Sequence, residues 1–216
     1  MKTKFIYLSA LLVMLAACKK EESKTETTVI STPTDTVAVT ETALQPMDSV
    51  AMEKAWQEYA TPNDKHKMLA DEAGSWTEDV TMWYAPDAKP MTTKMTAEVK
   101  MSLGGRFQTS VHKGNFMGMP FEGMNTVAYN NASGKYAQTW IDNMATGIMY
   151  MEGTYDESTK TINFSGECVD PLTKKSKKMR QTYAVVDKDT RKMESFDNTP
   201  DGKEYKSMEI IMKRKK

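Results

Sequence analysis

The sequence predicts a mainly β domain, in which an antiparallel meander of about eight to ten strands closes into a barrel, with short helices before it. From Ser75 onward, apolar and polar residues alternate in a series of short segments. Clusters of Asn, Asp, Ser, Gly and Pro separate these segments, and no helical pattern lies between them. Closure is expected because a meander of this length would otherwise leave open strand edges.

The region before the strands has the pattern of short helices. Asp48 and Ser49 are good N-caps for a helix that carries Trp56. A second helix is predicted to start with Pro62 in its first turn, where the missing N–H is tolerated. Gly74 is expected to end that helix.

Each predicted strand has apolar residues at alternate positions, as Trp76, Val80 and Met82 show in the first. The predicted strands lie near residues 76–84, 95–101, 106–112, 121–129, 135–142, 147–155, 160–168, 178–187, 191–196 and 204–212.

The N-terminus has the layout of a secretory signal. Lys2 and Lys4 precede an apolar run over residues 5–15, and small residues then lead to Cys18. An alanine-rich site followed by Cys resembles a bacterial lipobox, so residues 1–17 are predicted to be a signal peptide and Cys18 an acylated anchor. The alternatives are an uncleaved membrane anchor or a cytosolic helix, but a span needs about 20 apolar residues.

Residues 18–47 are predicted to be a lipid-anchored, disordered linker. This stretch is rich in Thr, Ser, Val and Glu and contains no aromatic residue, so it cannot bury enough apolar surface to fold. Lys19 follows Cys18, whereas Asp at that position is associated with inner-membrane retention. We therefore expect an outer-membrane lipoprotein, periplasmic or surface-exposed, whose folded domain spans residues 48–216.

Charge and cysteine content restrict the partners. The chain has 29 basic and 29 acidic residues, so no long-range field favours nucleic acid. Of the two cysteines, Cys18 is assigned to the anchor, which leaves Cys168 as a lone thiol. It alternates with Ile162, Phe164 and Gly166, and we interpret it as a small core residue rather than a nucleophile.

The sequence contains no recognisable catalytic pattern, which favours a non-enzymatic protein without a metal or cofactor. The chain has two histidines, His66 and His112, too few for a Cys/His zinc site. No GxSxG, phosphate-binding glycine loop or HExxH motif is present. His112 at a strand end is expected to be a surface residue, with haem ligation as the alternative. Asp142 with Glu152 is one of many acidic pairs that could support glycoside chemistry.

Seven short runs of the sequence carry a resemblance to known proteins: residues 103–107, 118–123, 139–147, 153–156, 170–171, 200–204 and 208–210. These runs resemble one bacterial family, catalogued as a domain of unknown function with the number 1579. The chain departs from its pattern at two turn positions, residues 128–131 and Lys174. The resemblance covers most of residues 65–214 and implies a lipocalin-like barrel, without an established activity, substrate or catalytic residue.

The leading functional hypothesis is a barrel that binds a small apolar or amphipathic ligand in its lumen. Barrels of this size have an interior that either fills with side chains or holds one ligand. The 19 methionines fit a core or a cavity lining better than a Cu(I) site. The alternatives are a structural or interaction lipoprotein with a filled barrel and, third, an uncharacterised envelope enzyme. The predicted ligand-binding residues are Arg106, Phe121, Tyr129, Trp140, Asp142 and Tyr150.

Residues 114–120 are predicted to form a loop that covers the open end of the barrel as a lid. Phe116, Met117 and Met119 would be costly to leave in water, and two glycines would let the segment move. The alternative is a hairpin whose apolar tip packs on the helix near Trp56 or Met68.

Overall fold

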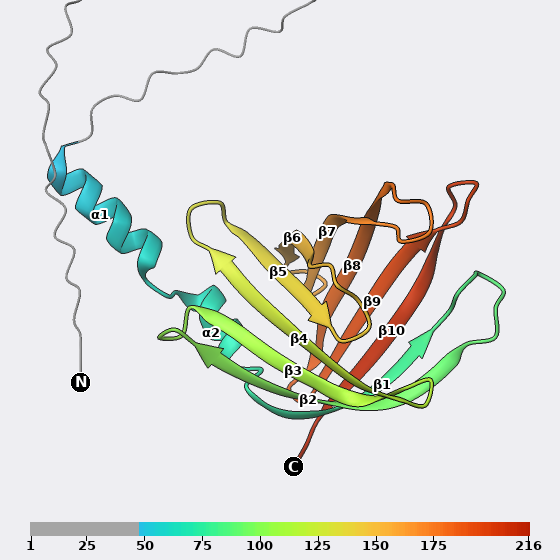
Figure 1. Cartoon of the computed structure of the whole chain (residues 1–216). Helices are drawn as coiled ribbons and strands as arrows, with labels where there is room; N and C mark the ends of the chain where they lie inside the picture. The colour runs from blue at the N-terminus through green and yellow to red at the C-terminus, as the bar shows by residue number, and fades with distance from the viewer. Residues whose placement is uncertain (1–47) are drawn as a thin grey trace, which may run out of the picture. The chain divides into compact units, whose positions relative to one another are not determined.

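A computed structural model describes residues 48–216, and the predicted signal peptide, Cys18 and the linker lie outside the described residues. Two helices, α1 (Ser49–Ala60) and α2 (Asp64–Ala70), precede ten strands (Figure 1). The strands are β1 (Gly74–Met82), β2 (Met91–Ser102), β3 (Phe107–Phe116), β4 (Met119–Asn130), β5 (Lys135–Asp142), β6 (Met149–Asp156), β7 (Thr161–Val169), β8 (Ser176–Asp187), β9 (Thr190–Asn198) and β10 (Glu204–Arg214).

The ten strands form a closed antiparallel barrel, which confirms the predicted meander. Each strand pairs with the next along the chain, and β1 pairs with β10 to complete the ring. The closing register places Trp76 opposite Arg214 and Val80 opposite Ile210. No strand edge is left open, because every strand has two neighbours.

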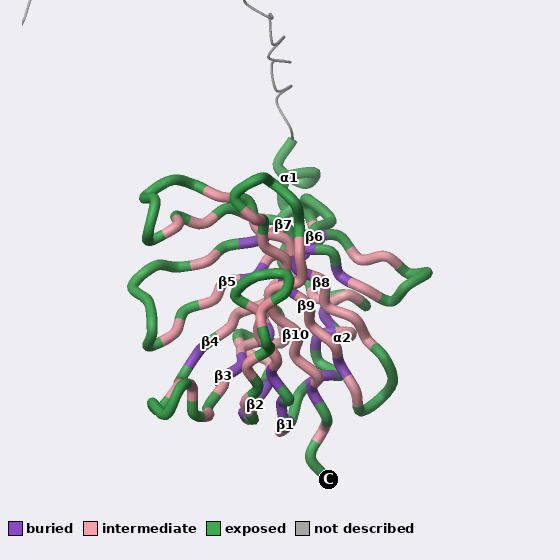
Figure 2. The backbone as a smooth tube through the Cα atoms, turned by 90° about the vertical axis from the view of Figure 1, so that its right-hand side faces the viewer, coloured by how far each residue is buried: buried purple, intermediate pink, exposed green. Residues whose placement is uncertain are grey.

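Alternation along the strands decides which side chains enter the barrel. In β1, Trp76, Glu78 and Val80 are buried, whereas Thr77 and Asp79 are exposed. Figure 2 shows the same contrast along the chain, with buried stretches inside the strands and exposed hairpin tips. Glu78 is a carboxylate at an inward position, so the interior is not purely apolar.

The helices differ from the prediction in their bounds. Asp48 is the N-cap of α1, as expected. The N-cap of α2 is Asn63, so Pro62 precedes the helix instead of opening it. A capping box explains this start, since the Asn63 side chain accepts from the first turn and the His66 ring accepts from the Asn63 N–H. The helix ends at Ala70, and Gly74 begins β1 with φ of +132°.

Helix α1 is exposed along its whole length and is held at its C-terminal end. The Asn131 amide donates to the carbonyls of Glu58, Tyr59 and Thr61, and Arg106 Nε donates to Ala60 at 2.9 Å. These bonds satisfy carbonyls that a helix C-terminus leaves free. None of the helices in the described part of the chain is long and apolar enough to cross a membrane.

Two groups of buried residues form the core, and both lie toward the end of the barrel where α2 packs. The larger group consists of Leu69, Tyr136, Met151, Ile162 and Phe164. The smaller group consists of Trp76, Ala97, Val99 and Met212, and the partly buried Tyr183 packs against both groups.

Candidate functional site

One end of the barrel is closed by α2 and a buried network around Glu72. Arg191 Nε donates to Glu72 Oε1 at 2.9 Å, and Gln108 and Tyr183 each donate to Oε2 at 3.0 Å. Trp76 Nε1 donates to the Glu72 carbonyl at 2.9 Å. These four donors give each oxygen of the buried Glu72 a hydrogen-bond partner. We call this region the closed end.

The middle of the barrel contains a second set of buried polar side chains. Gln138 Nε2 donates to Gln181 Oε1 at 2.6 Å, and Gln181 Nε2 donates to Ser195 Oγ at 2.9 Å. All three residues are at most 7% exposed. A ligand therefore cannot pass through the barrel unless this chain of hydrogen bonds opens.

One side of the opposite end is lined by inward residues of β1, β3, β4 and β5. In β3, Gln108 donates to Leu69 at the closed end, so Phe116 at the other end of the strand lies roughly 25–30 Å away. We call this second end the mouth. The inward residues on this side of the mouth include Glu78, Ser110, His112, Phe121, Asn125, Trp140 and Asp142.

His112 links two other polar side chains near the mouth. Its Nδ1 lies 3.0 Å from Glu78 Oε1, and its Nε2 lies 2.9 Å from Ser110 Oγ. A neutral ring can donate to the carboxylate and accept from the hydroxyl at once. This order is the connectivity of a serine–histidine–acid relay. Ser110 is however 7% exposed and lies one pleat deeper than His112, which suits an internal hydrogen-bond chain better than an exposed nucleophile.

Aromatic rings form one wall of the mouth. The Trp140 ring centroid lies 5.1 Å from that of His112 and 6.4 Å from that of Phe121, on which it stacks. Trp140 Nε1 donates to Asp142 Oδ2 at 2.7 Å. Gly123 makes this possible, because a Cβ there would lie 2.5 Å from the Trp140 ring. The wall thus presents flat apolar surface beside hydrogen-bonding groups.

Asn125 contributes an acceptor that no described side chain satisfies. Its Oδ1 is buried without a hydrogen-bond partner, and its Nδ2 reaches Gln138 Oε1 only at 3.5 Å. The residue lies directly opposite Ser110 on β3 and Trp140 on β5. A buried acceptor without a donor costs about 1–3 kcal/mol, so this position favours a molecule that can donate.

The sequence profile of DUF1579, described as a protein of unknown function, matches residues 61–214. The chain belongs to the DUF1579 family. A comparison with curated proteins gives no match. The match covers all ten strands of the barrel together with α2, so the closed end and the mouth both belong to the DUF1579 domain.

One solved structure supports the barrel fold. Rv2717c from M. tuberculosis is similar to this DUF1579 chain, with a TM-score of 0.55 and 14% identity, over 72% of this chain and 100% of that one. A redesigned β-barrel matches with a TM-score of 0.36 and 12% identity, over 68% of this chain and 95% of its own. At these identities the first likeness supports the barrel fold alone.

The structure brings three of the predicted ligand residues of the DUF1579 domain together. Phe121, Trp140 and Asp142 meet at the mouth. Tyr129 also faces inward but lies at the closed end, with its ring 4.9 Å from that of Tyr136 and 5.8 Å from that of His66.

Two predicted ligand residues lie outside the barrel. Tyr150 is 50% exposed and donates to Glu152 Oε1 at 2.7 Å on the outer surface. Its neighbours Met149 and Met151 occupy the inward positions of β6 instead. Arg106 is exposed in the β2–β3 turn and donates to Ala60 and Leu103, so the expected interior pair of Arg106 with Asp142 does not form.

The predicted lid is a tight hairpin between β3 and β4. Only Met117 and Gly118 separate the strands, both with positive φ (51° and 81°), as a two-residue turn of type I′ requires. Met117 and Met119 are 66% and 47% exposed, so they do not pack over a surface of the barrel. Phe116 packs on Phe121, with 6.4 Å between ring centroids, and joins the wall of the mouth. The alternative contact with the helices does not form either, because α2 packs at the other end of β3.

The polar residues of the mouth were not predicted from the sequence. His112 was expected at the surface, but its side chain is 12% exposed and faces inward. Glu78 lies two residues after Trp76, and Ser110 lies two residues before His112. Strand alternation therefore places each pair on one face, and this was the signal available in the sequence.

Burial raises the pKa of the Cys168 thiol, which agrees with an unreactive inward residue near the end of β7.

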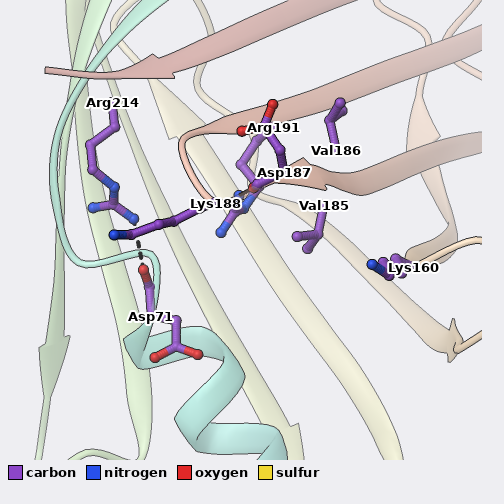
Figure 3. A pocket seen from close by; sticks show the side chains of 8 residues that line it. All are labelled: Asp71, Lys160, Val185, Val186, Asp187, Lys188, Arg191 and Arg214. Carbon is purple, nitrogen blue, oxygen red and sulfur yellow. Dashed lines mark hydrogen bonds between the residues drawn. The ribbon is translucent and has the colours of Figure 1, made fainter.

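Two hollows of the described residues lie on the outside of the barrel. One of about 560 Å³ borders the closed end and is lined by Arg191, Arg214 and Asp71, among others (Figure 3). Arg214 donates to the Asp71 carbonyl, and Arg191 donates to Glu72. Another of about 550 Å³ lies on the outer face of β6 and β7. Among residues 48–216, no group of three or more His, Cys, Asp or Glu side chains is arranged to hold a metal ion.

Proposed function

We propose that this domain is a non-enzymatic binding protein that takes a small amphipathic ligand into the mouth of the barrel. The observation that carries the proposal is the Trp140–Phe121 stack, which is only partly buried although it lies inside the ring of strands. It stands beside the buried Glu78 and His112. Ligand sites commonly combine aromatic walls with a few placed polar groups.

The filled closed end limits the size of the ligand. Trp76, Tyr136 and Met151 are 0% exposed, and the Gln138–Gln181–Ser195 chain lies beside Met151 in the middle of the barrel. The rival hypothesis of a filled barrel thus fits the closed end. The proposed ligand occupies only the other half, so it is expected to be about the size of one aromatic ring with a short chain.

Replacing Trp140 with Ala is expected to weaken binding of the neutral probe 4-phenylbutanol at least about tenfold, because the ring supplies most of the apolar wall. Isothermal titration calorimetry on the purified protein measures this. The Trp56→Ala variant is the matched control, since Trp56 is 64% exposed on α1 and should leave the affinity unchanged. Absence of saturable binding to the wild type, together with a clean apo mass in native mass spectrometry, would support the structural alternative.

We further propose that the chain is an outer-membrane lipoprotein anchored through Cys18, on the strength of the signal-like run over residues 5–15 and of Lys19 after the cysteine. Changing Cys18 to Ser is expected to abolish labelling by metabolic palmitate and to move the protein out of the membrane fraction, because acyl chains supply the membrane affinity. Palmitate labelling that persists in the Cys18→Ser variant contradicts the assignment.

A further inference from the structure

We infer that the mouth selects a ligand whose polar head is a cationic amine, and that it rejects carboxylates. The inference rests on the proposed function and adds the chemical class of the ligand. Three features of the mouth point to it: the sign of its uncompensated charge, the excess of hydrogen-bond acceptors, and the aromatic wall beside them.

The charge of the mouth is negative. Four charged side chains face inward in this half of the barrel: Glu78, Asp142, Lys177 and Asp197. Lys177 Nζ and Asp197 Oδ2 lie 2.7 Å apart and neutralise each other. Within the described residues, the other two carboxylates have no Lys or Arg partner. The Glu78 side chain hydrogen-bonds only to His112 in the described chain, so no lysine or arginine balances either carboxylate.

The polar groups of the mouth are mainly acceptors. Asp142 accepts from Trp140 Nε1 and from the Met144 N–H, both neutral donors, so its charge is retained. Asn125 Oδ1 accepts from nothing in the described chain. An ammonium group offers three donors and no acceptor, whereas a carboxylate offers only acceptors. Donors on the ligand thus match what the mouth lacks.

The aromatic wall favours the same class of ligand. Trp140 and Phe121 present ring faces, which attract cations by about 0.5–2 kcal/mol in proteins. The inward basic residues that could attract an anion are all engaged. In the mouth half Lys177 is paired with Asp197, and the others lie at the closed end. Arg191 binds Glu72, and Arg214 binds the carbonyls of Asp71 and Ala73.

The test compares three probes that differ only in the head group: 4-phenylbutylamine, 4-phenylbutanol and 4-phenylbutyrate. Calorimetry at pH 7.5 on the full-length protein should give the order amine, alcohol, carboxylate, with the amine at least about tenfold tighter than the carboxylate. Equal or tighter binding of the carboxylate overturns the inference while leaving the proposed function intact. If none of the three binds, the proposed function itself fails.

Variants identify the carboxylates responsible. Asp142→Asn and Glu78→Gln should each reduce the preference for the amine over the carboxylate by about threefold or more, because each removes one negative charge from the mouth. The control is Asp79→Asn, since Asp79 neighbours Glu78 on β1 but faces outward and binds Lys94. Asp142 lies at the partly exposed rim, so its variant remains informative if Glu78→Gln does not fold. A preference that is unchanged in Asp142→Asn, or that falls equally in Asp79→Asn, contradicts the inference.

Discussion

Replacing Arg191 with Met is expected to lower the free energy of unfolding by about 3–5 kcal/mol, because the change leaves the Glu72 carboxylate buried without a cation. The two side chains are 5% and 7% exposed, and their contact is 2.9 Å. Tyr183 and Gln108 also donate to the same carboxylate. Removing Arg191 from this network leaves Tyr183 and Gln108 around a Glu72 carboxylate whose charge no cation balances. Urea denaturation followed by circular dichroism measures the loss.

The matched control is Arg180→Met, which removes an arginine from an exposed pair. Arg180 and Glu204 are 41% and 45% exposed, so their contact should contribute no more than about 1 kcal/mol. The double variant Glu72→Gln with Arg191→Met removes both charges and should recover part of the loss. If Arg191→Met costs no more than Arg180→Met, the buried pair does not hold the closed end together.

The order of the strands followed from the sequence because a barrel meander depends on local signals. Alternation sets each strand and turn residues set each connection, so neighbours in the chain become neighbours in the sheet. The start of α2 was misplaced because Pro62 is tolerated in a first turn, whereas the Asn63 side chain offers a better cap. Cap geometry of this kind depends on which side chain reaches the free N–H groups, and several residues of the segment could do so.

The mouth was only partly predictable. Trp140 and Phe121 stood out as large aromatic residues at alternate positions. In β6, however, Met149, Tyr150 and Met151 are all apolar, so alternation does not show which of them faces inward. The pairing of Met151 with Gln138 decides it and places Tyr150 outside.

The polar members of the mouth depend on contacts between distant segments. Glu78 reaches His112 across the intervening strand β2, a relation set by the registers of two strand pairs. The residues next to Glu78 and His112 in the sequence do not indicate this contact. A glutamate among Trp76 and Val80 breaks the apolar pattern, and such a break is often where a site lies.

Replacing Trp76 with Ala is expected to cost about 3–5 kcal/mol of unfolding free energy, because it opens a cavity in the closed end. Trp76 is 0% exposed, and the Arg214 guanidinium lies 4.3 Å from its ring centroid. Its Nε1 also donates to the Glu72 carbonyl, so the substitution removes packing and one hydrogen bond together. Thermal unfolding should show a lower midpoint by roughly 2–4 °C for each kcal/mol.

Two further variants separate packing from the hydrogen bond and from a general effect of losing tryptophan. Trp76→Phe keeps most of the apolar volume but loses the hydrogen-bond donor. It should therefore lower the unfolding free energy less than Trp76→Ala, which loses the same hydrogen bond and also opens a cavity. Trp56→Ala changes a side chain that is 64% exposed and should stay within about 0.5 kcal/mol of the wild type. A Trp76→Ala variant as stable as Trp56→Ala would mean that the closed end is not the packed core of the barrel.

The mouth lies at the other end, so probe affinity measured on folded Trp76→Ala protein should match that of the wild type. A parallel loss of affinity would show that the two ends are coupled.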